Sequence, residues 1–306
     1  MSEKPLPHPP KAPRHWPSWL AVGFLWVLGK LPRGLGLAIT RPLGPLMHAL
    51  MGRRRAVAAR NIERCFPELG EEEVARLVRR SFRSLARAVT EMAWAWSGPD
   101  RLIARLGEVR GLEHLERARA AGKGVLMVTH HSTCLEIGAR LVIFEHQGVS
   151  GVYRPLKNPV MEWYQTRGRT RYADAMVSKR DARGAVRVLR AGKVLWYAPD
   201  QDFGPEQSVF APFFGIETAT LLATHRLPKM TGCAVVPMFP RWDAEAGRYV
   251  VEILPALEDF PSEDPVADLT RVNALMEAQV RKAPEQYWWI HRRFKTRPEG
   301  EPPFYR

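Results

Sequence analysis

The sequence predicts an α/β fold in which a mostly parallel central sheet is flanked by helices. The first observation is a fully apolar run at Val125–Val128, which is typical of a strand buried on both faces of a parallel sheet. The second is that strand-like runs alternate with helical segments from there to the C-terminus, as in folds built from β-α units. The strand-like runs are 151–154, 175–178, 194–198, 234–239 and 249–254, and the helical segments are 135–144, 159–172, 181–191, 219–231 and 265–282.

The domain organisation follows from length and composition. The chain of 306 residues has no Gly/Ser linker and no abrupt change in composition, so we expect one main domain with an N-terminal appendage. Residues 1–15 are Pro-rich and basic and are expected to be a flexible N-terminus. Residues 16–52 are expected to form a membrane anchor or interfacial segment, and residues 53–306 a single folded domain.

The anchor prediction depends on two apolar stretches. Residues 16–29 carry no charge and include tryptophans, which are enriched at headgroup depth, but the run is shorter than the roughly 20 residues that span a bilayer. An interfacial or partly inserted helix is therefore as well supported as a spanning one. Residues 35–51 are interrupted by glycine and proline and are expected to lie along the surface. The cluster Arg53–Arg55 marks either the anionic cytoplasmic leaflet or a solvated basic turn.

A long amphipathic helix is predicted for residues 71–96. Apolar residues recur there every three or four positions, and arginines occupy the opposite side. Glycine and proline at positions 98 and 99 end the pattern, and a shorter helix is predicted at 112–121. We assign the long helix no chemistry, because a core helix with a basic outer face explains its pattern.

The charge balance indicates an anionic partner. Forty-six Lys and Arg against 32 Asp and Glu give a formal net charge of +14, which suits nucleic acid, a membrane surface, or an acidic protein or ligand. The 3 cysteines are scattered, which favours a reducing compartment over a disulfide framework, and no pair has metal-ligand spacing.

The candidate catalytic residues follow the first predicted strand. His130 and His131 fall in the turn after Val125–Val128, at the carboxyl edge of the sheet, where ligands bind in open α/β folds. Glu136 lies five positions beyond His131, and the loop between them lets this carboxylate accept a proton from one ring nitrogen of His131. The other nitrogen would then be a base able to activate a hydroxyl. The alternative is that the histidines only end the strand and Glu136 is a solvated acid in the first helical turn.

These residues also carry a resemblance. His131-Ser-Thr-Cys-Leu-Glu136 resembles the His-x4-Asp/Glu motif of the glycerolipid acyltransferase superfamily. Further blocks are similar, in the same order, to the late acyltransferases of lipid A biosynthesis, the lauroyl and myristoyl transferases of Gram-negative bacteria. These blocks are 61–68, 153–159, 197–204 with 209–215, and 284–298, and the resemblance extends from about residue 15 to the C-terminus.

The resemblance implies a glycerolipid acyltransferase-like fold and a membrane-bound O-acyltransferase. The donor would be an acyl carrier protein thioester, with no other cofactor and no metal. The acceptor would be a hydroxyl on a hydroxyacyl chain of a Kdo-bearing tetra-acylated lipid A precursor, with lauroyl preferred over myristoyl or palmitoleoyl. His131 would be the general base and Glu136 would fix its tautomer, whereas Cys134 has no role in the motif. The location implied is the bacterial inner membrane, with the catalytic domain on the cytoplasmic face.

Residues after the later strands are the expected substrate contacts. Arg154 and Arg169 would bind phosphate or the carrier protein, because guanidinium groups hold phosphates bidentately. Within the matching blocks, we add Asn158 and Gln201 as substrate contacts and Asp200 as an acid that supports the site. The aromatic residues of 210–215 could line an acyl channel or could be plain core.

Two other function classes remain possible. Asp200-Gln201-Asp202 is an Asp-x-Asp sequence, by which metal-dependent glycosyltransferases hold a divalent ion. The terminal block 287–297 interleaves aromatics with cations, which suits single-stranded nucleic acid or a membrane interface. We favour the membrane interface beside an N-terminal anchor and expect no nucleic-acid partner. A non-catalytic basic protein would tolerate loss of His131.

Overall fold

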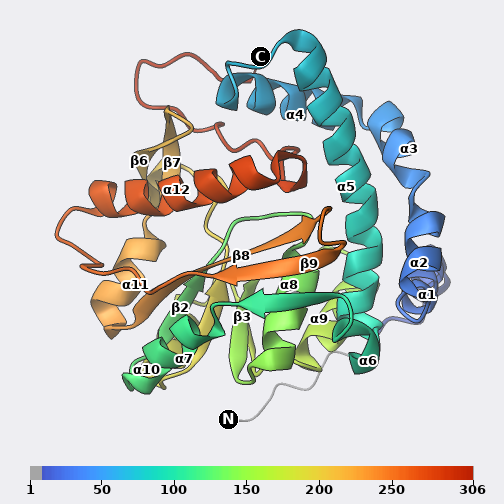
Figure 1. Ribbon diagram of the computed structural model, residues 1–306, viewed down its shortest axis with the longest axis horizontal. Coiled ribbons are helices and arrows are strands. Elements are labelled where there is room, and N and C mark those ends of the chain that lie inside the picture. Colours follow the sequence, from blue (N-terminus) through green and yellow to red (C-terminus); the bar gives the residue numbers. More distant parts are fainter. Residues whose placement is uncertain (1–8, 306) are drawn as a thin grey trace.

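The computed structural model describes residues 9–305 and contains a seven-stranded sheet. Several of its strands are labelled in Figure 1. The strand order is β1-β9-β8-β2-β5-β3-β4, and every neighbouring pair is parallel except β8 and β9. The strands are β1 (Gly107–Arg110), β2 (Val125–Val128), β3 (Val149–Tyr153), β4 (Met176–Ser178), β5 (Val194–Tyr197), β8 (Ala234–Asp243) and β9 (Arg248–Ile253). The prediction of an α/β fold with a mostly parallel sheet is confirmed.

Helices cover both faces of this sheet because its strands are apolar on both sides. Alternate residues of β2 show the division: Leu126 and Val128 belong to one buried cluster, and Val125 and Met127 to another. Helices α10 (Ala182–Arg190), α11 (Ala223–Thr231) and α12 (Pro265–Lys282) pack in the first cluster. Helices α7 (Leu112–Ala120) and α8 (Leu135–Glu145) pack in the second, and α9 (Pro159–Thr170) packs against α5 and α1.

The long helix α5 (Glu71–Ser97) joins the two clusters and supports the N-terminal helices. Its Phe82 packs with the first cluster and its Trp94 with the second, so the predicted core role of this helix is correct. Along its outer side lie α1 (Trp16–Leu28), α2 (Arg33–Thr40) and α3 (Leu43–Leu50), followed by α4 (Gly52–Cys65) (Figure 1). A one-turn helix, α6 (Asp100–Ile103), follows α5. Within residues 9–305, no helix has both the length and the apolarity needed to cross a membrane.

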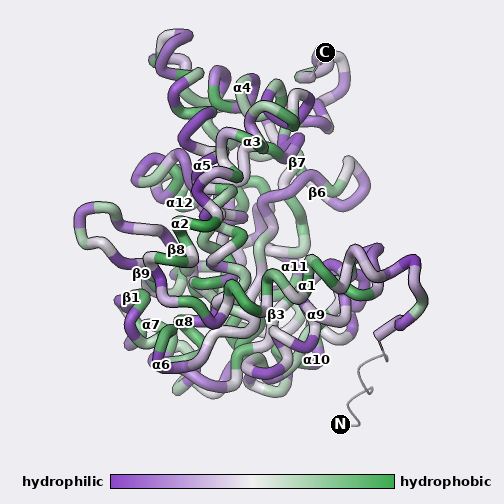
Figure 2. Tube along the Cα trace, turned by 90° about the vertical axis from the view of Figure 1, so that its right-hand side faces the viewer, coloured by the Kyte–Doolittle hydropathy of each residue, from purple (hydrophilic) through white to green (hydrophobic). Residues whose placement is uncertain are grey.

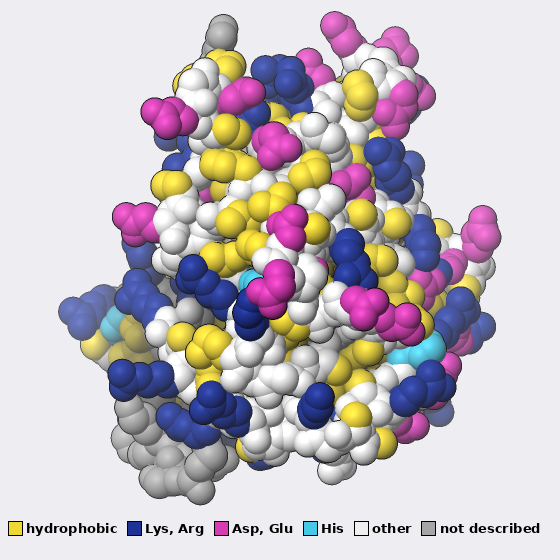
Figure 3. Space-filling model, turned by 90° about the vertical axis from the view of Figure 1, so that its left-hand side faces the viewer, with side chains coloured by type: hydrophobic (Ala, Val, Ile, Leu, Met, Phe, Trp, Pro, Cys, Tyr) yellow, Lys and Arg dark blue, Asp and Glu magenta, His cyan; other side chains and the backbone are white. Residues whose placement is uncertain are grey.

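The outward side of α1–α3 carries many large apolar side chains. Figure 2 views the molecule from the side on which these helices lie. Their exposed large apolar side chains are Trp16, Leu20, Phe24, Trp26, Val27, Leu35, Ile39, Leu46 and Leu50. On the opposite side, Figure 3 shows Lys and Arg gathered at the lower left without Asp or Glu among them.

The structure differs from the prediction in the segment after β5, where two strands were not predicted and one helix starts later than expected. The expected helix 219–231 begins too early, because Ile216, Thr218 and Thr220 alternate as β-branched residues and form a strand. A separate antiparallel hairpin results, with β6 (Ser208–Phe213) and β7 (Ile216–Leu221). Helix α11 starts at Ala223 instead.

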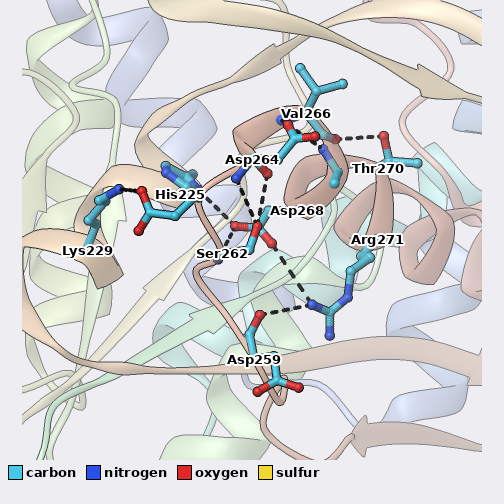
Figure 4. A network of polar contacts seen from close by, with 11 residues as sticks. His225, Lys229, Asp259, Ser262, Asp264, Val266, Asp268, Thr270 and Arg271 are labelled. Carbon is cyan, nitrogen blue, oxygen red and sulfur yellow. Dashed lines mark hydrogen bonds and ion pairs between the residues drawn. The ribbon is translucent and has the colours of Figure 1, made fainter.

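A buried polar network fixes α11 to α12. Figure 4 shows the imidazole of His225 pointing at the carboxylate of Asp268, with the two groups 2.9 Å apart. The same carboxylate accepts the backbone N–H of Ser262 at 2.8 Å, so it also holds the loop that leads into α12. Asp264 caps α12 by accepting the N–H groups of its first turn. This network stabilises the helices that cover one face of the sheet.

Candidate active site

His131 lies at the carboxyl edge of β2 and is held by Asp200 at the end of the neighbouring strand β5. Nδ1 of His131 is 2.5 Å from Oδ1 of Asp200, and the backbone N–H of His131 donates to Oδ2 at 2.8 Å. The side chain of Asp200 is only 3% exposed, whereas that of His131 is 26% exposed. One carboxylate therefore fixes both the ring and the backbone of His131, and the ring remains accessible.

The electrostatics of this pair favour an ionised Asp200. Burial alone would raise its pKa, but the adjacent His131 and the backbone N–H bond outweigh burial and bring the pKa below its usual value. An ionised Asp200 can accept a hydrogen bond from the Nδ1–H of His131. The Nε2 lone pair is then available to take a proton from a substrate.

The prediction that Glu136 accepts a hydrogen bond from His131 is wrong. Glu136 lies in the first turn of α8 and turns toward α9 and α5, where it forms an ion pair with Arg169. Its Oε2 also accepts the indole N–H of Trp96 at 2.7 Å and Nε of Arg169 at 3.2 Å. Parallel neighbouring strands end side by side, so the carboxylate that reaches His131 comes from β5 rather than from the same loop.

An apolar pocket begins beside the Glu136–Arg169 pair. It lies between α5, α8, α9 and the sheet and has an empty volume of about 530 Å³, including its open part. Along α8 it extends from Glu136 past Ala139 to Ile143, that is, from the carboxyl edge of the sheet toward the amino edge. The remaining lining is mainly apolar: Ala95, Trp96, Met127, Val142, Val149, Tyr172, Ala173, Met176, Trp196 and Met238. Its mainly apolar lining suits a hydrocarbon chain.

Of the two interpretations of residues 210–215, an acyl channel or plain core, the structure supports core. Phe213 and Phe214 belong to the β6–β7 hairpin and are buried in the core. Phe214 packs against Phe66 and Trp289, with ring centroids 5.1 Å and 6.3 Å away. The aromatic cluster is therefore core, and the apolar pocket described above lies on the other face of the sheet.

The terminal segment, residues 284–297, closes over the histidine loop rather than facing lipid. Trp288 N–H donates to the carbonyl of His131 at 3.1 Å, and Thr133 N–H donates to the carbonyl of Gln286 at 2.8 Å. Trp289 is 1% exposed and Arg293 is 2% exposed. The prediction that this block forms a membrane interface is wrong, because its aromatic rings are needed to bury the loop that carries His131.

The buried cation of this segment, Arg293, is held by hydrogen bonds to the β6–β7 hairpin. Arg293 donates hydrogen bonds from Nη1 to the carbonyl of Ala219 at 2.6 Å and from Nη2 to Oγ1 of Thr220 at 3.3 Å. Asn61 on α4 donates to the carbonyls of Trp289 and His291. The first and last matching blocks of the sequence therefore meet in space and hold the histidine loop.

Two neighbours of His131 have packing roles. His130 is stacked on Tyr287 at 5.6 Å, and burial lowers its pKa to about 4, so it stays neutral. Cys134 is buried and its Sγ contacts Gln286 Oε1 at 3.1 Å. Burial and then the nearby Glu91 raise the pKa of the Cys134 thiol well above its ordinary value, which opposes thiolate formation.

The other residues predicted to contact substrate lie in different surroundings. Arg154 is exposed at the end of β3, and Gln201 is partly exposed next to Asp200. Asn158 is engaged structurally: Oδ1 caps α9 by accepting two N–H groups, and Nδ2 donates to Ser18 at 2.7 Å. Asn158 therefore has a structural role in the fold, and its role in substrate binding stays a prediction.

The two carboxylates of the Asp-x-Asp sequence do not face a common point. Asp200 binds His131, whereas Asp202 accepts the N–H of Gly204 and both the N–H and the hydroxyl of Thr296. In residues 9–305, no group of three or more His, Cys, Asp or Glu side chains is arranged to hold a metal ion. The pair of acids is explained by its protein partners.

Sequence reasoning missed the positioning residues Trp96, Gln286 and Trp288. Each lies far along the chain from His131, so no spacing rule relates them. Only the carboxyl-edge argument gave a usable signal, because it placed Asp200 and His131 on the same rim.

Comparisons with known proteins support the resemblance. The sequence profile described as "Bacterial lipid A biosynthesis acyltransferase" matches residues 8–296. The chain is 41% identical to the lipid A biosynthesis lauroyltransferase of Escherichia coli (strain K12), over 96% of each chain. It is 38% identical to the palmitoleoyltransferase of that organism, over 96% of this chain and 95% of the relative. Identity to the myristoyltransferase of the same organism is 32%, over 94% of this chain and 90% of the relative. The chain therefore belongs to the bacterial lipid A biosynthesis acyltransferase family.

Proposed function

We propose that this protein transfers a fatty acyl chain, preferably lauroyl, from acyl carrier protein to a hydroxyacyl chain of a Kdo-bearing tetra-acylated lipid A precursor. The observation that carries the proposal is a base held by a buried carboxylate, His131 on Asp200, at the sheet edge from which an apolar pocket extends. We favour a lauroyl donor because this protein is 41% identical to the relative named a lauroyltransferase. Its identity to the palmitoleoyltransferase is 38% and to the myristoyltransferase 32%.

The chemistry requires only a base, a thioester and a place for developing charge. Nε2 of His131 removes the proton of the acceptor hydroxyl as its oxygen attacks the thioester carbonyl. Asp200 stabilises the imidazolium that forms and keeps its ring in place. The tetrahedral intermediate then collapses, and the leaving thiolate of the carrier takes the proton from His131. The acyl group moves directly, so no acyl-enzyme, metal or cofactor is needed.

Arg169 and Glu136 would act on the donor. Arg169 lines the apolar pocket, and the ion pair with Glu136 fixes the plane of its guanidinium. A cation fixed there can donate to the thioester carbonyl as negative charge develops on its oxygen. In this proposal, Glu136 positions Arg169 and does not act on His131.

The membrane proposal uses the outward face of α1–α3. These helices expose tryptophans, leucines and other large apolar side chains along one side of the molecule. Such a face suits insertion into the lipid interface with the helices lying in its plane. We place the protein at the cytoplasmic face of the bacterial inner membrane, where the carrier protein and the lipid precursor can both reach His131.

The first test is mass spectrometry of the acceptor lipid after incubation with acyl carrier protein charged separately with decanoyl, lauroyl, myristoyl or palmitoyl chains. We expect the mass of a single lauroyl group to be added. His131→Ala should abolish this product, because no other group replaces the base. His114→Ala is the matched control, since that histidine on α7 has a similar exposure, 24% against 26%, and lies away from the pocket. A folded, lipid-bound wild type that adds no chain would refute the proposal.

Chain length should respond to the depth of the apolar pocket. Ala139→Leu fills the pocket along α8 and should shift the preferred donor to a shorter chain. Ile143→Ala, one turn further from Glu136, should shift it to a longer one. Each methylene excluded or admitted is worth about 0.8 kcal/mol, or roughly fourfold in relative kcat/KM. Competition between two charged carrier proteins in one reaction measures this ratio. Equal ratios in wild type and both variants would mean that the chain binds elsewhere.

A further inference from the structure

Three cations form a cluster beside the active site that the proposed mechanism does not use. Arg154 directly follows β3, and Lys179 and Arg180 directly follow β4. Tyr153 pairs with Ser178, and Lys179 N–H donates to the carbonyl of Tyr153 at 2.8 Å, so these strand ends lie side by side. Because neighbouring strands are only about 4.8 Å apart, Arg154 and Lys179 emerge next to each other. We call Arg154, Lys179 and Arg180 the cationic cluster.

The cationic cluster is close to the loop that carries Asp200. The ammonium group of Lys179 is 5.0 Å from the ring centroid of Phe203, three residues beyond Asp200. The three strand ends β2, β5 and β3 are consecutive in the sheet, and β4 follows them at its edge. A ligand that reaches His131 from this side therefore passes the cationic cluster.

In the part of the chain that the structure describes, the cationic cluster has no ion-pair partner. Within residues 9–305, none of the three side chains forms an ion pair. The nearby carboxylates of Asp181 and Glu162 accept backbone N–H groups from Gly184 and Leu156 and form no ion pair with the cluster. Partial burial, followed by the charges of Arg154 and Arg180, lowers the pKa of Lys179. The three exposed side chains carry like charges, and an anion bound among them would relieve their repulsion.

The cationic cluster and the apolar pocket belong to different sides of the site. Met176 of β4 lines the pocket, whereas the next residue, Val177, belongs to the core of the opposite face. Phe203, beneath Lys179, packs on that opposite face too. If the pocket takes the acyl donor, the side with the cationic cluster is open to the acceptor.

A lipid-borne anion fits this position better than a protein. Asn158, four residues after Arg154, is bonded to Ser18 of α1, so the cluster lies near the helix whose apolar side chains are exposed. A guanidinium and an ammonium together bind the oxygens of a phosphate through charge-assisted hydrogen bonds. We propose that Arg154, Lys179 and Arg180 bind a phosphate group of the lipid acceptor and so direct its hydroxyl toward His131.

This inference rests on the proposed function, and kinetics can separate the two. The variants are Lys179→Ala and the double variant Arg154→Ala/Arg180→Ala. Lys123→Ala is the charge-matched control. Lys123 is exposed in the turn before β2, at the amino end of that strand, and the cationic cluster lies at the carboxyl ends. We expect Lys179→Ala to raise KM for the acceptor roughly tenfold or more, as loss of a hydrogen bond to a charged group does, and to leave KM for the acylated carrier protein unchanged. Lys123→Ala should change neither constant.

The source of the anion is tested with acceptor from which phosphate has been removed enzymatically. The penalty of Lys179→Ala should disappear with this acceptor, because both enzymes then lack the contact. A penalty that persists, or one that falls on KM for the carrier protein, would overturn the inference. Unchanged constants in both cluster variants would overturn it as well. If the wild type itself transfers no acyl chain, the proposed function fails first, and a sedimentation assay with vesicles containing the phosphorylated lipid still measures whether the cluster binds it.

Discussion

Asp200→Asn should lower kcat by roughly three to four orders of magnitude while leaving the fold intact, as the equivalent change does in Ser-His-Asp enzymes. The carboxylate oxygens of Asp200 accept from both Nδ1 and the backbone N–H of His131. An amide of the same shape keeps one acceptor, but its NH2 group favours the tautomer in which Nδ1 is the acceptor. Nε2 then carries the proton and cannot serve as a base.

The measurement is single-turnover acyl transfer compared with substrate binding. We expect KM for both substrates to change little, because Asp200 is buried behind His131 and is only 3% exposed. Asp202→Asn is the matched control, since Asp202 carries the same group two residues away but bonds to Gly204 and Thr296. A loss below tenfold in Asp200→Asn, or an equal loss in both variants, would argue against His131 as the base.

The same pair of residues shows what sequence reasoning could reach. The strand Val125–Val128 was predicted with its observed bounds, because a run of four apolar residues has few alternatives. The carboxyl-edge rule then placed His131 and Asp200 on the same rim. The rule could not decide whether Glu136 or Asp200 is the carboxylate that binds His131. That depends on whether the first turn of α8 faces the histidine loop or α9, and on which strand lies next to β2 in the sheet.

Other errors have equally local causes. β1 was missed because Gly107–Arg110 contains one apolar residue, Val109, and becomes a strand only by pairing with β9. The terminal segment was predicted to face lipid because aromatics and cations alternate in it. That composition does not reveal that both terminal nitrogens of the Arg293 guanidinium donate hydrogen bonds to Ala219 and Thr220, which lowers the cost of its burial.

The terminal segment should therefore be a determinant of stability, and Trp289→Ala should cost about 3–5 kcal/mol of unfolding free energy. Trp289 is 1% exposed and contacts Phe66, Phe214 and Tyr287 with ring centroids between 4.7 Å and 6.3 Å away. Its indole N–H also donates to the carbonyl of Pro284 at 2.6 Å. Alanine would leave a cavity under the histidine loop and remove this hydrogen bond.

Urea unfolding of Trp289→Ala and Trp288→Ala, followed by intrinsic fluorescence, separates this role from a general effect of losing a tryptophan. Trp288 is partly exposed, and its contact with His131 is made by its backbone N–H, which alanine retains. We expect Trp288→Ala to lose less than half as much stability and to keep its activity. Trp289→Ala should lose transfer activity even where it remains folded, because the segment that holds the His131 carbonyl becomes mobile. If the two variants unfold at the same urea concentration, the segment is not anchored by Trp289, and the aromatic cluster around Phe213 and Tyr287 must hold it alone.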